Sequence, residues 1–378
     1  MLELTLERIV KVNPNLSVEI KKRKLKLIKS KIESEFTKGQ FSKSVDCSLT
    51  FLDNVLKGKM KPTLGLLSRI CKKLGIEING IALKIIPRSK GKSFIFIRDL
   101  PIKVSPELAS LVGHSFGDGH IGISSFAFTN KSEKLREEVI NLVRQLPIRN
   151  LSFNEWNHKA ITIRFNSLVK SILLASGAIK GDKVAKCFSI PTWIKNGNKE
   201  IKVAFLKALF DDEASINVTS RQIHLTLHKI MKFEKNLEAF FKGLANMLNS
   251  LNIKGISILN EKERKTEKHG IVKVQRLFIC GLINFKLFKE NIGFIIPQKT
   301  EKLDRLIKKI KRNRTSPKEI PERLMKLLRK ESTLGTPEIA KLSKISLSAA
   351  LDNLKELEKR DIVKKDLIRN KDFEWSLK

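Results

Sequence analysis

Long apolar runs, clustered cysteines and a secretion signal are all missing from this sequence of 378 residues. No apolar run approaches the about 18 uninterrupted residues of a membrane span. The first residues, MLELTLERIVKVNPN, mix acids with bases, whereas a signal peptide has a basic start followed by an apolar core. We therefore expect a cytoplasmic protein without a membrane segment.

The four cysteines are widely scattered, and none is separated from a second cysteine or a histidine by the two residues typical of a zinc site. This spacing argues against a zinc site of that kind. We expect all four cysteines to be reduced and to be buried as small hydrophobic residues. They are Cys47, Cys71, Cys187 and Cys280.

Acidic residues are scarce, since 39 Asp and Glu stand against 75 Lys and Arg, which gives a formal net charge of +36 and a pI near 10.1. Such a charge creates a field that attracts polyanions. The hydrophobic share of 41% and the charged share of 30% are typical of a globular chain, and the length allows two or more domains. We predict a multidomain protein whose partner is nucleic acid rather than an acidic membrane surface.

Basic stretches with proline divide the chain. The segments PRSKGKS at 87–93 and KRNRTSPKEIP at 311–321 lack an apolar period, which is typical of linkers. The block before the first linker is lysine-rich, and its period predicts helices. The predicted domains span 1–92, 100–200, 201–312 and 318–378.

Residues 41–76 predict a helix that ends near Val45, a turn, a second helix over 49–56 capped by Ser48, and a third helix that carries Leu66 and Ile70. This pattern resembles the helix-turn-helix of the phage-repressor family. The resemblance implies that the second helix enters the major groove of DNA. The alternative is a small helical packing module whose lysines are merely solvated. The side chains that the second helix would present are Thr50, Asp53, Asn54 and Lys57.

The tail after residue 318 predicts one helix from Thr336, another introduced by Ser346, and two strands in DIVKKDLIRNKDFEWSL. This order resembles a winged helix, in which the helix over 348–360 would read DNA. That helix carries three acids, so a protein contact or a purely structural role stays open. The acids are Asp352, Glu356 and Glu358.

The central block contains two similar stretches, LASLVGHSFGDG at 108–119 and AFLKALFDDEAS at 204–215. Glycine inside a helix costs roughly 1 kcal/mol relative to alanine, so its presence needs a reason. Small residues spaced four apart lie on one face of each helix. We expect these faces to pack closely against each other. The small residues are Ala109, Gly113 and Gly117 in the first stretch and Ala204 and Ala208 in the second.

Both stretches end on an acid at the same position, Asp118 in the first and Glu213 in the second. If the helices pack in a parallel, pseudo-twofold arrangement, the two carboxylates converge. Like charges repel unless a cation lies between them, and carboxylate oxygens suit Mg²⁺, or Mn²⁺ in its place. Two acids and a divalent metal in a basic protein indicate phosphodiester hydrolysis.

The pair LVGHSFGDG (111–119) and LKALFDDEA (206–214) resembles the doubled LAGLIDADG motif of homing endonucleases, in the DOD-type subgroup. Similar follower segments occur at 177–194 and 283–303, so the resemblance covers about residues 100–312. It implies an α/β fold with two αββαββα-like halves and saddle-shaped antiparallel sheets. The complete expected architecture places this pseudo-twofold core between the helix-turn-helix and winged-helix-like domains.

Carried over by position, the resemblance implies that Asp118 and Glu213 are the metal-binding catalytic acids. Lys183 and Lys299 occupy positions where the family often has a basic residue near the scissile phosphates, where a positive charge stabilises the transition state.

The sequence departs from the family pattern at two positions. Ala214 replaces the final glycine of the second motif, and Phe116 replaces an acid in the first, where we expect it to pack. We expect Asp211 to cap or orient locally and Asp212 to lie on the helix flank, so neither enters the catalytic set.

Apolar and polar residues alternate over 160–166 and 222–228, which predicts two half-buried strands, while 131–146 and 232–251 have a helical period. The resemblance implies that the polar faces of the sheets meet the major groove. His224 and His228 could also be read as metal ligands, but the family uses carboxylates. The predicted DNA contacts from the strands are Thr162, Arg164, His224 and Thr226.

The resulting hypothesis is a site-specific, divalent-metal-dependent endonuclease of double-stranded DNA. A monomer suffices because both motifs lie in one chain, and we expect a free-standing protein rather than an intein, since the chain begins without Cys or Ser and ends without a His-Asn pair. The alternatives are a non-cleaving DNA-binding transcriptional regulator on the same scaffold and an RNA-splicing maturase. Two uncompensated, converging carboxylates argue against the regulator.

Overall fold

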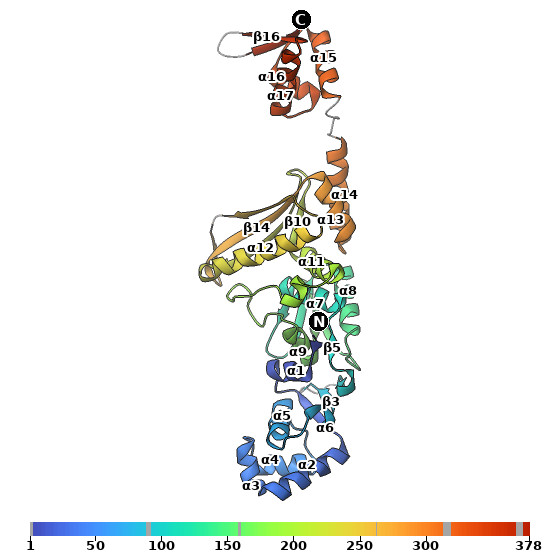
Figure 1. Cartoon of the computed structure of the whole chain (residues 1–378), viewed down its shortest axis with the longest axis vertical. Coiled ribbons are helices and arrows are strands. Elements are labelled where there is room, and N and C mark those ends of the chain that lie inside the picture. Colours follow the sequence, from blue (N-terminus) through green and yellow to red (C-terminus); the bar gives the residue numbers. More distant parts are fainter. Residues whose placement is uncertain (1–2, 88–91, 158–159, 262, 313–318, 368–372) are drawn as a thin grey trace. The chain divides into compact units, whose positions relative to one another are not determined.

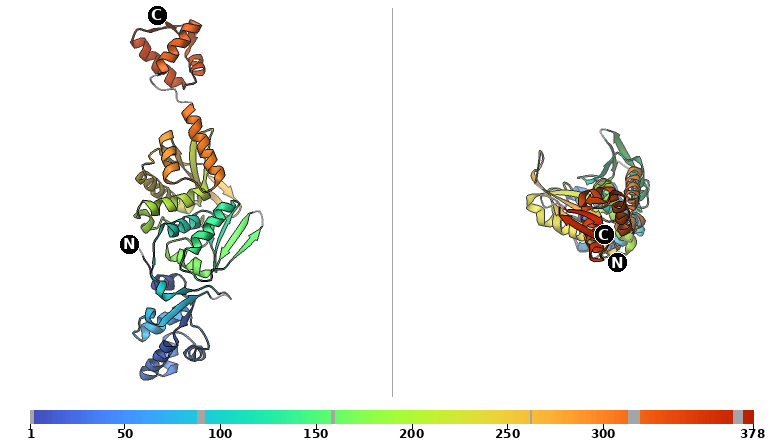
Figure 2. Two further views of the ribbon diagram at one scale, coloured as in Figure 1. Left: turned by 90° about the vertical axis from the view of Figure 1, so that its right-hand side faces the viewer. Right: turned by 90° about the horizontal axis from the view of Figure 1, so that it is seen from above.

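The computed structural model describes residues 3–87, 92–157, 160–261, 263–312, 319–367 and 373–378, in two compact units, Met1–Leu303 and Asp304–Lys378 (Figure 1, Figure 2). Parts of both predicted linkers, residues 88–91 and 313–318, lie outside the described residues. The predicted segments 1–92 and 100–200 lie together in the first unit. Within the described ranges, every helix is too short or too polar to cross a membrane.

The N-terminal block contains strands as well as helices, so the expectation of a purely helical block is wrong. Val18 and Ile85 are fully buried and pair across the antiparallel strands β2 and β3, because alternating apolar residues can bury one face of a strand. A further strand at the N-terminus, β1, pairs with β5. The bounds are β1 Glu3–Leu4, α1 Leu6–Val12, β2 Ser17–Ile20, β3 Ala82–Ile86, β4 Ile95–Phe96 and β5 Ile102–Lys103.

Five helices lie between β2 and β3, and they confirm the helix-turn-helix elements predicted from the sequence. The Ser48 hydroxyl accepts a hydrogen bond from the Phe51 amide at 3.2 Å, so Ser48 caps α4 as predicted. Asp46 adopts a positive φ of 52° in the turn between α3 and α4. The helices are α2 Lys22–Glu35, α3 Lys38–Ser44, α4 Leu49–Leu56, α5 Leu64–Lys73 and α6 Ile78–Ile81.

The central region repeats one order of elements, helix, strand, strand, helix, strand, strand, helix, which confirms the predicted α/β class with two αββαββα-like halves. Each half forms an antiparallel sheet. The first half consists of α7 Pro106–Phe116, β6 Gly119–Ile121, β7 Phe126–Asn130, α8 Glu133–Arg144, β8 Phe153–Asn157, β9 Ile161–Phe165 and α9 Ser167–Ala175. The second consists of α11 Lys199–Glu213, β10 Ala214–Asn217, β11 Gln222–Ile230, α12 Glu234–Ser250, β12 Ile256–Asn260, β14 Gly270–Cys280 and α13 Leu282–Asn291, with β13 Arg264–Thr266 inserted before β14.

The two sheets have matching strand orders, β6-β7-β9-β8 in the first half and β10-β11-β14-β12 in the second. Helix α8 packs on β7, and helix α12 packs on β11 and β14 (Figure 1). Apolar side chains such as Ile163 and Leu225 fill these contacts, which leaves the opposite face of each sheet to polar residues. The motif helices α7 and α11 each run directly into the first strand of their own half.

The second unit confirms the helices and strands predicted for the tail. Its core includes Trp375, which is fully buried and whose indole nitrogen donates to the Thr336 hydroxyl at 2.9 Å. Ser346 caps α17 by accepting from the Ala349 amide. Helix α14 Pro297–Arg312 crosses the boundary between the units, and the later elements are α15 Ile320–Glu331, β15 Thr333–Gly335, α16 Thr336–Ser343, α17 Leu347–Lys359, β16 Val363–Leu367 and β17 Phe373–Leu377.

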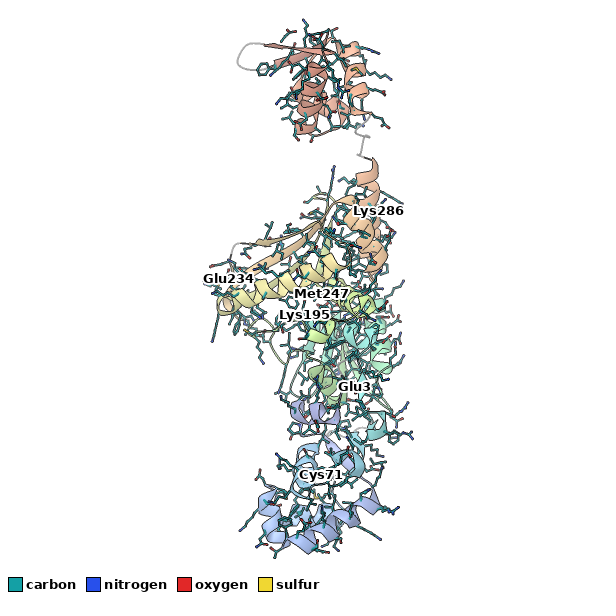
Figure 3. All side chains as sticks on the ribbon, viewed as in Figure 1. Glu3, Cys71, Lys195, Glu234, Met247 and Lys286 are labelled. Atoms are coloured by element: carbon teal, nitrogen blue, oxygen red, sulfur yellow. The ribbon has the colours of Figure 1, made fainter. Side chains whose placement is uncertain are left out.

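All four cysteines are free thiols, as expected, but the prediction that all are buried is wrong. Only Cys71 is buried, in the apolar side of α5 (Figure 3), and its burial raises the thiol pKa to about 11. Cys187 and Cys280 are exposed. Cys187 lies in the loop segment that follows α9, and Cys280 is the last residue of β14.

Candidate active site

The two motif helices touch along their small-residue faces, which confirms the predicted close approach. A methyl group built on Gly113 of α7 would lie 2.7 Å from the Phe205 carbonyl oxygen and 2.8 Å from the Ala208 Cβ, both on α11. Real Cβ atoms do not approach other atoms this closely, so only glycine fits. Ala204 was expected to form part of this contact, but it is partly exposed, and its buried neighbour Phe205 lies at the contact instead.

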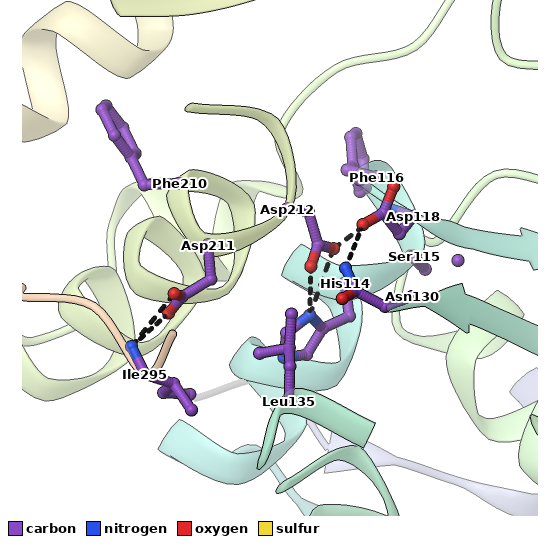
Figure 4. Close-up of polar contacts among 12 residues, drawn as sticks. His114, Ser115, Phe116, Asp118, Asn130, Leu135, Phe210, Asp211, Asp212 and Ile295 are labelled. Carbon is purple, nitrogen blue, oxygen red and sulfur yellow. Dashed lines mark hydrogen bonds and ion pairs between the residues drawn. The ribbon is translucent and has the colours of Figure 1, made fainter. Parts of the chain in front are cut away.

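Asp212 lies between the helices rather than on a helix flank, so that expectation is wrong. Its side chain is fully buried and occupies the space that a side chain on Gly117 would need. Both carboxylate oxygens lie 3.1 Å from Nδ1 of His114, and one accepts from the Asp118 amide at 3.0 Å (Figure 4). Asp212 therefore fixes the backbone that carries Asp118.

His114 is the second residue of the site that the sequence did not identify. Burial lowers the pKa of its imidazole, but the carboxylate of Asp212 outweighs this effect, and the net pKa is raised. The His114–Asp212 pair therefore joins the two motif helices inside their interface. The sequence did contain a signal for this pair. Gly117 and Asp212 occupy the same position of the two motifs, and a glycine that faces an acid indicates that the acid points into the interface between the helices.

Asp118 and Glu213, the two predicted acids, lie at the ends of these packed helices. Burial raises the pKa of Asp118 to about 6, and the charge of Asp212 adds to the shift. Burial likewise raises the pKa of Glu213 to about 7, where the charges of Asp118 and Asp212 contribute. Asn130 donates a hydrogen bond to Asp118 at 2.6 Å. The two acids thus share one electrostatic environment that disfavours their ionised forms.

Lys183 and Lys299 hold equivalent carbonyl groups at the ends of the two motif helices. The Lys183 ammonium donates to the carbonyls of Ser115 at 3.4 Å and Phe116 at 3.0 Å, and also to the carbonyl of Gly117. Such groups lack partners inside a helix and form the negative end of its dipole, so a cation is favourable there.

In the second half, the Lys299 ammonium donates to the Phe210 carbonyl at 3.2 Å and to the Asp211 carbonyl, which occupy the matching motif positions. Burial lowers the pKa of both lysines, and the carboxylates of Asp118 and Glu213 oppose this shift. The structure therefore brings both predicted lysines into the environment of the two acids.

Phe116 and Asp211 occupy the same motif position in the two halves, but they make different contacts. Phe116 packs as expected and stacks on Phe240, with 5.7 Å between the ring centroids. Asp211 is a cap, but its partners are distant in sequence, because its carboxylate accepts from the amides of Ile295 and Ile296 at 3.0 and 3.2 Å. It anchors the start of the segment that carries Lys299.

The predicted contacts on the sheets lie on the polar faces of their strands. Thr162 bonds to the Thr129 hydroxyl at 2.8 Å, and Arg164 is exposed. Thr226 accepts a hydrogen bond from Arg276. Burial lowers the pKa of His224, with a further contribution from the charge of Arg276. All these residues lie outside the cluster of acids and lysines described above.

The predicted contacts on α4 lie in the N-terminal block. Thr50 and Lys57 are exposed and Asn54 is partly exposed, so the side chains can be reached from solvent. Lys57 forms an ion pair with Asp53 one helical turn earlier. That pair offsets part of the positive charge that α4 offers to a nucleic acid.

The cluster fits a divalent cation of the Mg²⁺ type. Asp118 and Glu213 offer carboxylate oxygens, the ligand type that Mg²⁺ prefers, and besides burial the charge of Asp212 contributes to their raised pKa values. Among the described residues, no group of three or more His, Cys, Asp or Glu side chains is arranged to hold a metal. Mg²⁺ needs no such cage, because one or two carboxylates with waters and phosphate oxygens complete its shell.

Similarity to known proteins extends over parts of the chain. The tRNA-splicing ligase RtcB of Pyrococcus furiosus is 29% identical over 203 residues, which cover 47% of this chain and 21% of the relative. The replication factor C small subunit of Methanocaldococcus jannaschii is 25% identical over 332 residues, 80% of this chain and 16% of the relative. The chain thus spans about a fifth of the length of these curated relatives.

A solved structure, full-length DUF199/WhiA from Thermatoga maritima, superposes with a TM-score of 0.35 and 16% identity over 69% of this chain and 93% of that chain. Residues 200–293 match the family model described as a LAGLIDADG-like domain. The match begins in α11, contains Glu213 and ends after α13. The second half of the central region is therefore similar to a LAGLIDADG-like domain.

Proposed function

We propose that the chain is a site-specific endonuclease of double-stranded DNA that uses Mg²⁺ or Mn²⁺. One observation carries the proposal: Asp118 and Glu213 lie at the ends of two helices in contact, with pKa values raised to about 6 and about 7. Two acids held in that state favour a bound cation. The net charge of +36 supports a polyanionic substrate.

The residues of the cluster would divide the work. Asp118 and Glu213 would hold the metal, which when bound activates the attacking water and offsets charge on the phosphate. Asp212 keeps the Asp118 backbone in place through the amide hydrogen bond. Lys183 and Lys299 hold the helix ends and add positive charge beside the phosphate.

A non-cleaving DNA-binding protein on the same scaffold is the second candidate, and one observation favours it. The carboxylates of Asp118, Asp212 and Glu213 share their environment with the ammonium groups of Lys183 and Lys299. The two ammonium groups offset part of the negative charge, so the acids are less exposed to mutual repulsion than two isolated carboxylates would be. A partly compensated cluster of this kind is compatible with a protein that binds DNA without a metal.

Cleavage of a duplex library separates the two candidates. The purified full chain is incubated with randomised duplex DNA in Mg²⁺, beside Asp118→Asn and Glu213→Gln. We expect a staggered double-strand cut by the native protein and a loss of at least about 10³-fold in rate for both variants, because each removes a charged ligand of the metal. Both variants should still bind the selected duplex.

The matched control is Glu200→Gln, which makes the same chemical change at the opposite end of α11, where the side chain is exposed. It should cut at the native rate. A native protein that selects a duplex in Mg²⁺ or Mn²⁺ and never cuts it supports the second candidate instead. Affinity for DNA should fall steeply with salt, because a protein this basic displaces many counterions; a flat response would contradict both candidates.

A further inference from the structure

An exposed tryptophan lies on the polar face of the first sheet. Trp156 on β8 is 43% exposed, although a large apolar ring is normally buried. The guanidinium carbon of Arg164 on β9 lies 3.9 Å from the centroid of the Trp156 ring. This distance is that of a cation–π stack. The two side chains therefore form a stacked pair on the surface.

The strand register explains how the pair forms. Asn154 pairs with Arg164 and Trp156 pairs with Thr162, so Trp156 and Arg164 are diagonal neighbours on the same face. Ala127 lies opposite Arg164 on the other side, in β7. The cross-strand neighbour on that side is therefore a single methyl group.

Arg164 also borders a hollow of about 330 Å³. The polar side chains that line it with Arg164 are neutral hydroxyl and amide groups, which can bind base edges or phosphates. None of the lining residues in the described part of the chain is an acid that could pair with the arginine inside the hollow. The polar lining residues are Ser93, Ser124, Ser125, Ser152, Asn154 and Asn166.

The stack determines what Arg164 can bind. Stacking occupies one face of the planar guanidinium and restricts its orientation, while the N–H donors point outward along the edge of the plane. Two such donors match the O6 and N7 acceptors of guanine in the major groove, and no other base presents this pair. An arginine that is already oriented loses less conformational entropy on binding.

The second sheet offers an arginine in a different state. Arg276 on β14 donates to Glu261 at 2.7 Å and to the Thr226 hydroxyl at 3.0 Å. Two of its nitrogen atoms are thus engaged, and its charge is paired with that of Glu261. The two sheets therefore present unequal surfaces to a duplex.

We propose that Arg164 reads a guanine in the part of the DNA target that lies under the first sheet, and that Trp156 is the positioning residue for this contact. This inference rests on the proposed binding of double-stranded DNA and specifies one base of the target. It is independent of cleavage.

Binding selection tests the inference. The full chain is presented with a randomised duplex library in the absence of divalent metal, and the bound sequences are read. The variants are Arg164→Lys, which keeps the charge and loses the fork, Trp156→Leu, which loses the ring, and Trp156→Phe, which restores one. Arg276→Lys is the matched control on the second sheet.

We expect the native protein to select guanine at one position that Arg164→Lys no longer discriminates. Affinity for the selected duplex should fall about 5- to 100-fold in Arg164→Lys, while affinity for random DNA and its salt dependence should change less than about twofold. Trp156→Leu should weaken the same position, Trp156→Phe should restore most of the preference, and Arg276→Lys should leave it unchanged.

Three results contradict the inference in different ways. If Arg164→Lys selects the native sequence, the contact is absent. If Trp156→Leu behaves as the native protein while Arg164→Lys does not, Trp156 has no positioning role. If the native protein selects no sequence at all, both this inference and the proposed site-specific function are wrong, whereas selection without cleavage leaves this inference intact.

Discussion

The two halves of the central region share one order of elements and differ where their motif helices end. Helix α7 ends in Phe116 and Gly117, whereas α11 ends in Asp211, Asp212 and Glu213. At one motif position the first half leaves a space and the second half fills it with Asp212. The interface is therefore complementary at this position rather than symmetric, so neither helix could be replaced by a copy of the other.

The two lysines, in contrast, make the same kind of contact in both halves. Lys183 and Lys299 come from corresponding places in the element order, since Lys183 follows α9 and Lys299 follows α13, the last helix of each half, and they bind carbonyls at matching positions. Capping the helix end is thus common to both halves. What differs between the halves is the side chains that fill the interface.

Gly113→Ala should have the largest effect on the contact between the two halves. The added methyl group would overlap the Phe205 carbonyl, a backbone atom that cannot rotate away, so the helices must separate. We expect a loss of on the order of 3 kcal/mol in the free energy of unfolding, as overpacking of a close contact costs. Urea denaturation of the full chain measures it.

The control is Gly39→Ala in α3, where the added methyl group meets nothing within 4 Å. There alanine should leave stability unchanged or raise it by up to about 1 kcal/mol, because helix propensity alone decides. Equal effects of the two substitutions would show that the helices do not rely on their close approach.

Local patterns account for what the sequence could predict. Ser48 and Ser346 identified helix starts because a cap acts within three residues, and alternation over 160–166 identified a strand because its period is local. The doubled motif identified the two helices and their contact. Each of these inferences uses only short stretches of sequence, and the motif adds the comparison of one short stretch with another.

The rest of the site depends on partners that are far apart in sequence. His114 and Asp212 are 98 residues apart, and Asp211 meets Ile295 over 84 residues. A flanking acid and a capping acid look the same in a sequence, because the difference lies in which helix faces them. The strands in residues 1–92 were missed for a related reason, since they are short and lie between lysine-rich helices.

Replacing the two lysines compares the halves directly. Lys183→Met should cost about 2 kcal/mol of stability, because it leaves buried carbonyls at the end of α7 without a partner. Lys299→Met should cost about half as much, because Lys299 binds two carbonyls and Lys183 binds those of Ser115, Phe116, Gly117 and Gly119.

Thermal unfolding in metal-free buffer measures both losses. Lys286→Met, on the exposed surface of α13, serves as the control for removing a lysine, and it should change stability by less than about 0.5 kcal/mol. A larger loss for Lys299→Met than for Lys183→Met would contradict the proposed order.

The acids should destabilise the metal-free protein at neutral and higher pH. The folded pKa of Glu213 is about 7, above its ordinary value of 4.5, so the folded state binds the proton more tightly. Stability is therefore lost as the pH rises from 4.5 through 7. Glu213→Gln removes this loss and should stabilise the metal-free protein by on the order of 1 to 2 kcal/mol at pH 8.

The same substitution should have little effect at pH 4, where Glu213 is protonated in both states. Mg²⁺ should stabilise the native protein at pH 8 and leave Glu213→Gln nearly unaffected. A variant less stable than the native protein at pH 8, measured by thermal unfolding without metal, would show that Glu213 is held by favourable contacts instead.

The smallest expected effect concerns the residue after each acid. A methyl group on Gly119 would lie 2.6 Å from the His114 carbonyl oxygen, whereas Ala214 at the matching position is buried and accommodated. Ala214→Gly should cost about 0.5 to 1 kcal/mol, through the greater backbone freedom of glycine in the unfolded chain. Gly119→Ala should cost more, because a backbone atom must move. If Ala214→Gly and Gly119→Ala lower the free energy of unfolding by the same amount, the extra room around Ala214 does not affect stability. The asymmetry between the halves is then confined to Gly117 and Asp212.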